Sequence, residues 1–192
     1  GMYSVQNALA AAAVCREVGI SLERIAETLN HTKGVKGRSE IIDTGRDFSV
    51  ICDYAHTPDG LKNILPSIKK FTKGRLITLF GCGGNRDAGK RPIMGDVAAE
   101  YSDFLIVTSD NPRLEDPIAI IDDILPGVKK HQTEYVVVPS RKEAIFYAIQ
   151  HAQPGDVVVL AGKGHEDYQV LGKEKIHFDE REIVREALAT LA

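Results

Sequence analysis

The sequence contains no tryptophan, and only six phenylalanines and six tyrosines are spread over its 192 residues. So few aromatic side chains argue against the stacking platforms on which single-stranded nucleic acids lie. An excess of positive charge is also missing. The formal net charge is −3, which excludes the broadly basic surface of a general nucleic-acid-binding protein. No apolar run has the length of a membrane span, and no secretion signal is visible. We therefore expect no nucleic-acid partner, no membrane partner and a cytoplasmic location.

Cysteine is scarce too, and Cys15, Cys52 and Cys82 are odd in number and far apart. This spacing matches neither a disulfide framework nor a zinc site, so it predicts reduced thiols and no bound metal. Cys82 lies in a glycine-rich stretch, where a reactive thiol is one interpretation. A small side chain that fits a tight turn is the simpler interpretation, and we favour it.

What is present is a globular composition, with 43% hydrophobic and 27% charged residues. From residue 40 onwards, short apolar runs alternate with helical patterns, which predicts an α/β fold with a Rossmann-like, doubly wound and mostly parallel sheet. The expected strands are 40–44, 48–54, 76–80, 104–108, 135–138 and 157–161, followed by a hairpin of 169–171 with 175–177. The expected helices of this part are 58–71, 92–101, one from 118 that Pro126 and Gly127 interrupt or end, 141–152, and one from about 180.

The first 36 residues have a different character. They predict two helices, 4–18 with Ser4 as N-cap and Gly19 as the stop, and 21–29. Two helices cannot bury much apolar surface alone, so this segment is interpreted as the end of something larger. A polar, glycine-rich stretch at 31–38 is the expected boundary. The chain is therefore divided into residues 1–36 and residues 37–192.

The stretch 75–92, RLITLFGCGGNRDAGKRP, predicts a strand, a turn through three glycines and a helix that begins at Pro92. This arrangement directs backbone N–H groups and a helix N-terminus at an anion. Arg86, Lys90 and Arg91 add positive charge. Residues 84–91 differ from a P-loop in their last position, because Arg91 offers no hydroxyl for Mg²⁺. A helix that begins at Pro92 would also start too late, and we reject the P-loop interpretation.

Unusual polar residues follow four of the expected strands, at the edge where open α/β sheets bind ligands. These residues are Asp53, Tyr54, His56 and Asp59; Arg86; Asp110, Asn111 and Arg113; and Gly162, Lys163, Gly164, His165, Glu166 and Asp167. Local turns explain some of them, since Asp53 can cap the next turn and Asp110 with Asn111 can form an Asx turn. Guanidinium groups bind carboxylates and a carboxylate binds an ammonium. Arg86, Arg113 and Glu166 together therefore predict an amino-acid site, beside an Asp53 that suits a ribose hydroxyl.

Four motifs in this order, DYAHTPDGL, GCGGNRDAGKRP, TSDNPRLEDP and AGKGHEDYQ, resemble the C-terminal part of Mur ligases. The resemblance covers nearly the whole chain. It implies that residues 1–36 are the last helices of a central ATPase domain and that residues 37–192 are the C-terminal domain. Members of this family activate a carboxylate with ATP, and an incoming amine then forms an amide bond. The resemblance implies an amino-acid site of Arg86, Asp110, Asn111, Arg113, Gly162 and Glu166. It implies ATP contacts for Asn7 near the adenine, Arg38 at the phosphates, Asp53 at the ribose, and Tyr54 and His56 beside the nucleotide.

Residues 110–113, Asp-Asn-Pro-Arg, resemble the form found in members that add meso-diaminopimelate in peptidoglycan synthesis. Arg113 would pair with the far carboxylate of that substrate and would repel the ammonium of lysine. The resemblance also implies ATP and Mg²⁺ as cofactors and the UDP-MurNAc-dipeptide as acceptor. The chain lacks the family's P-loop, carbamylated lysine, Mg²⁺ ligands and UDP-binding domain, so we expect no catalytic residue in it and no ligation by it alone.

Two other interpretations stay open. One is the equivalent domain of a lysine-adding or folylpolyglutamate-type relative, which would give Arg113 no carboxylate to bind. The other is a non-catalytic nucleotide-binding module, which should bind ATP well on its own.

Overall fold

The computed structural model describes residues 2–32 and 34–191, and the chain divides into two compact units, residues 1–35 and residues 36–192. The first unit contains α1 (Met2–Glu17) and α2 (Leu22–His31). Ser4 lies inside α1 rather than at its N-cap, because the helix begins at Met2, so that prediction is wrong. Gly19 ends the helix as expected, with φ at +88° and its N–H bonded to the Arg16 carbonyl. The domain assignment of residues 1–36 stays a prediction.

The second unit is built on a six-stranded sheet in the order β1-β2-β6-β3-β4-β5. Only β1 runs antiparallel, so the prediction of a mostly parallel, doubly wound sheet is confirmed. The strands are β1 (Glu40–Ile42), β2 (Ser49–Asp53), β3 (Leu76–Phe80), β4 (Phe104–Val107), β5 (Glu134–Val137) and β6 (Val157–Ala161). A separate hairpin joins β7 (Tyr168–Leu171) to β8 (Glu174–His177).

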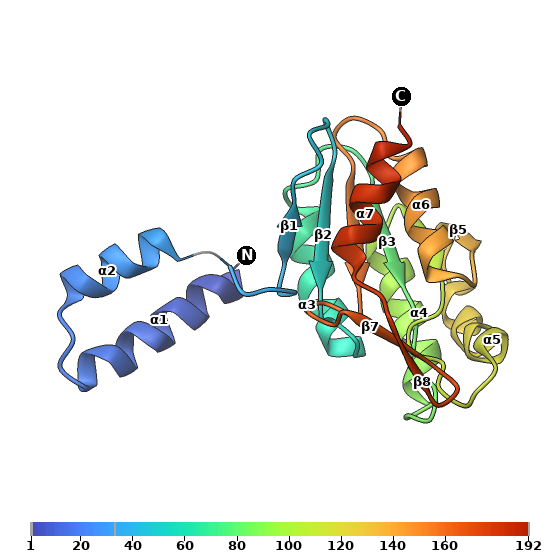
Figure 1. The fold of residues 1–192 in the computed structure, drawn as a ribbon, viewed down its shortest axis with the longest axis horizontal. Helices are drawn as coiled ribbons and strands as arrows, with labels where there is room; N and C mark the ends of the chain where they lie inside the picture. Colours follow the sequence, from blue (N-terminus) through green and yellow to red (C-terminus); the bar gives the residue numbers. More distant parts are fainter. Residues whose placement is uncertain (1, 33, 192) are drawn as a thin grey trace. The chain divides into compact units, whose positions relative to one another are not determined.

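Helices cover both faces of this sheet (Figure 1). Each face has its own hydrophobic core. One core holds α3 (Pro58–Lys69), α4 (Lys90–Tyr101) and α5 (Pro117–Val128), and the other holds α6 (Arg141–His151) and α7 (Glu180–Ala189). All five residues of β3 are buried, which explains why this strand is a continuous apolar run. The result is a three-layer α/β unit in which the ends of the parallel strands are free to carry loops.

The start of α4 and the end of α5 differ from the prediction in a way that bears on the glycine-rich loop and on helix packing. Helix α4 begins at Lys90, two residues before Pro92, so the argument that it starts too late for a P-loop is wrong. Helix α5 runs through Pro126 and Gly127 to Val128. Gly127 serves close helix packing, because a Cβ there would lie 1.8 Å from the Pro92 carbonyl oxygen of α4. The glycine that seemed to be a stop signal therefore sets the distance between two helices.

Candidate functional site

Four loops meet at one edge of the sheet, because β2, β6, β3 and β4 are consecutive in it and parallel. The loops after these strands carry the polar residues that the sequence singles out. This edge lies at the carboxyl ends of the strands, where ligands bind in open α/β sheets. The predicted convergence of the four loops follows from the topology.

The glycine-rich loop after β3 is joined to the loop after β4. The N–H of Gly84 donates to the Asn111 carbonyl at 2.9 Å, and the N–H of Leu114 donates to the Asn85 side chain at 3.0 Å. A Cβ at position 84 would lie 1.9 Å from the Pro112 carbonyl oxygen. The two loops that carry Arg86 and Arg113 are thus held together by backbone contacts.

Arg113 is held in place by backbone groups at both ends. Its φ is +53°, and its N–H donates to the Val170 carbonyl at 3.1 Å. Its Nη1 donates to the carbonyl oxygens of Gly84 at 2.9 Å and Asn111 at 3.3 Å. The guanidinium is half-buried and has further N–H groups available. A residue outside the usual φ region at such a position is typical of functional sites.

The three cations of the glycine-rich loop have different surroundings. Arg86 is exposed, whereas Arg91 is buried and pairs with Glu115 and Asp123, both at 2.8 Å. Lys90 donates to the His56 carbonyl at 2.8 Å. The prediction that all three present positive charge to an anion is therefore corrected: within the described structure, Arg86 is the one of the three without a carboxylate or carbonyl outside its own loop.

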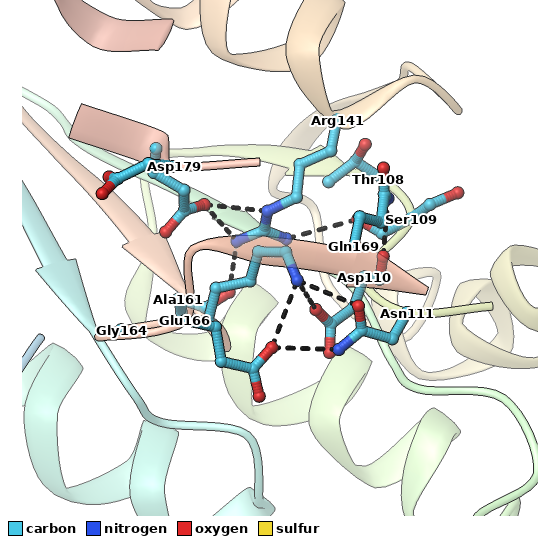
Figure 2. A network of polar contacts seen from close by, with 12 residues as sticks. Thr108, Ser109, Asp110, Asn111, Arg141, Ala161, Gly164, Glu166, Gln169 and Asp179 are labelled. Carbon is cyan, nitrogen blue, oxygen red and sulfur yellow. Dashed lines mark hydrogen bonds and ion pairs between the residues drawn. The ribbon is translucent and has the colours of Figure 1, made fainter. Parts of the chain in front are cut away.

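A buried polar network lies behind these loops (Figure 2). The ammonium of Lys163, a fully buried side chain, lies 3.0 Å from Asn111 Oδ1, 3.3 Å from Glu166 Oε2 and 3.4 Å from Asp110 Oδ1. Asn111 Nδ2 donates to Glu166 Oε2 at 3.0 Å, and its Oδ1 also accepts from the N–H of Val170 at 3.0 Å. The aspartate and asparagine of the DNPR motif thus contact the lysine and glutamate of the GKGHE motif.

A fully buried ion pair adjoins this network. Arg141 lies 2.8 Å from Glu180, and both side chains are completely inaccessible. Arg141 also donates to the Ala161 carbonyl at 2.9 Å, at the end of β6. Burial raises the pKa of the Glu180 carboxyl, and the nearby Arg141 opposes that effect.

The charges of this region do not balance. Lys163 and Arg141 are two basic groups, and Asp110, Glu166 and Glu180 are three acidic groups, so the acidic groups outnumber the basic ones by one. Glu166 is the most exposed of these carboxylates, at 14%. Charged groups are rarely buried without compensation. Asp110 and Glu166, the two partly exposed acidic groups, are therefore where a positively charged partner would be accommodated.

A second group of residues surrounds the Tyr54 ring, after β2. The Arg38 guanidinium lies 5.0 Å from the ring centroid, and the rings of His56 and His165 lie 4.6 and 4.9 Å from it. Asp53 is buried beneath them and accepts from the N–H groups of Ser39 at 2.7 Å and of Ala55 at 2.8 Å. The latter bond is the local turn that the sequence offered as an alternative interpretation of Asp53.

The segment before β1 is attached to the GKGHE loop. Gly37 has φ at +71°, and a Cβ there would lie 2.0 Å from the His165 nitrogen. The N–H of Gly37 donates to Glu40 at 2.7 Å, and Arg181 joins Glu40 to the Gly164 carbonyl at 2.7 and 2.8 Å. Arg38 is thereby fixed beside Tyr54.

Most of the predicted site residues lie either in the network around Lys163 and its adjoining loops or in the group around Tyr54. The roles of these residues stay predictions. Asp110 is buried against Lys163, and Gly162 has φ at +118° and bonds through its N–H to the Asp53 carbonyl at 2.9 Å. Asn7 is exposed on α1, in the other compact unit. Cys82 is buried, and burial raises its pKa to about 12, so the packing interpretation is confirmed.

Sequence reasoning placed Lys163 among the polar residues of this edge without giving it a role, and it did not single out Tyr168. The Tyr168 ring centroid lies 5.7 Å from the Lys163 ammonium, and the charge of Glu166 raises the pKa of Tyr168. The signal for Lys163 was its place between two glycines directly after an apolar strand. Such a position turns a long side chain inward, although lysine seldom occurs in a protein core.

Comparison with known families gives a match over residues 37–164 to the Mur ligase, glutamate ligase domain. The match covers well over half of the chain and ends within the GKGHE loop. The chain belongs to the Mur ligase family. The predicted family and fold class are both confirmed.

Individual Mur ligases are similar over almost the whole chain. The UDP-N-acetylmuramoyl-L-alanyl-D-glutamate–2,6-diaminopimelate ligase of Caldanaerobacter subterraneus subsp. tengcongensis is 56% identical over 189 residues, which are 98% of this chain and 39% of the relative. A solved structure of a ligase with the same name has a TM-score of 0.79 and 38% identity, again over 98% of this chain and 39% of its own. The Thermotoga maritima folylpolyglutamate synthase structure, with a TM-score of 0.64, 24% identity and coverage of 99% and 39%, shows the shared fold alone. The chain thus spans about two fifths of the length of these Mur ligase relatives.

Within residues 2–32 and 34–191, no three histidine, cysteine or acidic side chains are grouped as a metal site requires. No helix in the same residues combines the length and the apolar composition that a membrane crossing needs.

Proposed function

We propose that this chain is the C-terminal domain of an ATP-dependent ligase that adds meso-diaminopimelate to UDP-MurNAc-L-Ala-D-Glu in peptidoglycan synthesis. In this proposal residues 37–192 bind the incoming amino acid and part of ATP, and the preceding helices belong to the central ATPase domain. The name shared by the 56% identical relative and the 38% identical structure supports this choice of reaction.

The observation that carries the proposal is the surplus carboxylate of Glu166 at the edge where Arg113 and Arg86 lie. The buried network holds one more acidic group than basic groups, and Glu166 is the most exposed of its acidic groups. An ammonium would balance this surplus. The guanidinium groups of Arg113 and Arg86 suit carboxylates, which they bind with two parallel hydrogen bonds. A ligand with both charges, an amino acid, satisfies this edge.

Arg113 favours meso-diaminopimelate over lysine. The two amino acids differ at the far end, where diaminopimelate has a carboxylate beside its ammonium and lysine has the ammonium alone. A fixed guanidinium attracts the first end group and repels the second. A lysine-adding relative would give Arg113 no partner, and the folylpolyglutamate-type alternative rests on likeness of fold only.

ATP fits the group around Tyr54 in part. An aromatic ring beside a guanidinium and two imidazoles suits a base or ribose and a phosphate. A carboxylate has about four acceptor positions. Asp53 uses up to three of them for Ser39 and Ala55, which leaves room for one ribose hydroxyl. In the proposed ligase, the Mg²⁺ ligands, the other phosphate contacts and the UDP-MurNAc-dipeptide site come from the remaining three fifths of the protein. The chain alone is then inactive in ligation. The cytoplasmic location stays a prediction.

The test is a titration of the ¹⁵N-labelled chain with meso-diaminopimelate, L-lysine and ATP in turn, followed by backbone amide shifts. We expect meso-diaminopimelate to move the amides of the 83–86, 111–113 and 162–166 loops, and ATP to move those near Tyr54. An equal response to lysine would contradict the role of Arg113. Ligation by the chain alone would contradict the division of labour between domains.

The variant Arg113→Ala separates specificity from general binding. We expect it to weaken meso-diaminopimelate binding about 10- to 100-fold, because one charge-assisted pair is lost. Lysine binding should stay the same or improve. Arg185→Ala, which removes an exposed arginine from α7, is the matched control and should change neither.

A further inference from the structure

Lys163 is the central cation of the buried network, and its surroundings are unusual for a lysine. Its side chain is completely inaccessible, and its ammonium contacts Asn111, Glu166 and Asp110 at 3.0 to 3.4 Å. The rings of Tyr168 and Phe178 close over it at 5.7 and 5.8 Å. An inaccessible ammonium cannot contact a substrate, so any effect of Lys163 on ligand binding must pass through its three polar partners.

The first effect of Lys163 is on the orientation of the Asn111 amide. Asn111 Oδ1 accepts from the Lys163 ammonium and from the N–H of Val170, both at 3.0 Å. Both partners are donors only, so the amide oxygen must face them. The amide nitrogen is then turned towards Glu166, to which it donates at 3.0 Å.

The second effect is on Glu166. Its Oε2 accepts from Asn111 at 3.0 Å and from Lys163 at 3.3 Å, so one carboxylate oxygen is fixed from the protein interior. The Tyr168 side chain also hydrogen-bonds to this carboxylate. A carboxylate has about four acceptor positions, so one is left for a ligand. Asp110 faces the same ammonium at 3.4 Å, and its Oδ1 is buried without a hydrogen bond in the described structure. Without Lys163 the carboxylates of Asp110 and Glu166 would share one pocket with no cation between them.

We propose that Lys163 is the positioning residue of the amino-acid site: it orients Asn111 and Glu166 so that Glu166 presents its remaining acceptor position to the ammonium of the incoming amino acid. The inference rests on the proposed function for the identity of the ligand. The orientation of Asn111 does not depend on that function. The two claims can therefore fail separately.

The experiment measures the affinity of the chain for meso-diaminopimelate by calorimetry and the hydrogen exchange of the Asn111 side-chain amide by NMR. Lys163→Met removes the cation. Asp110→Asn/Lys163→Met removes the cation together with one of its carboxylates, which avoids an unpaired buried charge. Lys175→Met is the matched control, because Lys175 lies 3.6 Å from the Tyr168 ring centroid but has no recorded contact with Asn111 or Glu166.

We expect Lys163→Met and the double variant to bind at least about tenfold more weakly, since a charge-assisted contact and its geometry are lost. The Asn111 amide protons should exchange faster in both, and Lys175→Met should stay within about twofold of the unmodified chain. Unchanged affinity and exchange in a folded Lys163→Met would overturn the inference. So would full recovery in the double variant, because Lys163 would then only neutralise Asp110.

If Lys163→Met does not fold, the affinity and the Asn111 amide exchange of the double variant test the inference. If neither variant folds, Lys163 serves the fold as a whole and the inference is wrong. If the unmodified chain does not bind meso-diaminopimelate, the proposed function fails, and the exchange of the Asn111 amide in the variants still shows whether Lys163 orients it.

Discussion

The buried pair of Arg141 and Glu180 offers a quantitative test of the structure. Replacing Arg141 with methionine keeps the volume of the side chain roughly constant but leaves the Glu180 carboxylate without its cation. Both side chains have zero exposure, so water cannot take over the role of Arg141. Removing one partner of a buried ion pair costs about 3–5 kcal/mol. Arg141 also donates to the Ala161 carbonyl. The variant loses this hydrogen bond too, and the range of about 3–5 kcal/mol includes that loss.

Domains of this size are stable by about 5–15 kcal/mol, so the Arg141→Met variant should still fold at neutral pH but be clearly weakened. Urea unfolding followed by circular dichroism measures the difference. The double variant Arg141→Met/Glu180→Leu removes both charges and should recover most of the loss, because a well-packed apolar pair often replaces a buried ion pair without cost.

The pH dependence gives an independent check of the same pair. Burial raises the pKa of Glu180, so the native state binds a proton more readily than the unfolded state does. Stability then decreases as pH rises from the unfolded pKa of about 4.5 towards the folded value. Without Arg141 the pKa of Glu180 should rise further. The stability lost in Arg141→Met should therefore be smaller at pH 5, where Glu180 can take up a proton, than at pH 8. A loss below about 1 kcal/mol at pH 8, or one that does not depend on pH, would refute the reasoning.

Three further predictions concern the site and its attachment to the segment before β1. Glu166→Gln should weaken the binding of meso-diaminopimelate and of L-lysine alike by at least about tenfold in calorimetry, because both carry the ammonium that Glu166 accepts. Arg181 holds the pKa of the Glu40 carboxyl below its usual value, so Glu40 adds stability above about pH 4.5 that is lost as pH falls through its folded pKa. Arg181→Gln should flatten that acid dependence in urea unfolding, and an unchanged slope would contradict the pairing. Gly37→Ala should destabilise the chain by more than about 1 kcal/mol, since the backbone at Gly37 is left-handed and a Cβ there would lie 2.0 Å from the His165 nitrogen. Equal thermal midpoints of Gly37→Ala and the unmodified chain would speak against this contact.

The fold was predictable where local pattern and tertiary environment agree. The β3 and β6 strands occupy the predicted residues 76–80 and 157–161, because continuous apolar runs suit strands that are covered on both faces. The start of α4 and the end of α5 were not predicted correctly. Gly127 is required where α4 and α5 cross, and that contact joins segments far apart in sequence.

The candidate site was predictable as a set of loops but not as a network. The order of strands and helices is enough to bring four loops to one edge. The partners of individual charges were out of reach, because they depend on side chains from distant segments. Arg91 pairs with Asp123 across 32 positions, and Lys163 meets Asn111 across 52. The position of Arg91 in a glycine-rich loop predicts that it binds an anion, whereas Arg91 is neutralised within the protein by Glu115 and Asp123.

A crystal structure of the chain grown with meso-diaminopimelate would test the central claim most directly. The account predicts that one ammonium of the ligand lies about 3 Å from the Glu166 carboxylate and that a carboxylate of the ligand lies within hydrogen-bonding distance of the Arg113 guanidinium. The Asn111 amide should keep its oxygen towards Lys163. A ligand bound with an ammonium against Arg113, or bound away from the edge formed by these loops, would contradict the account.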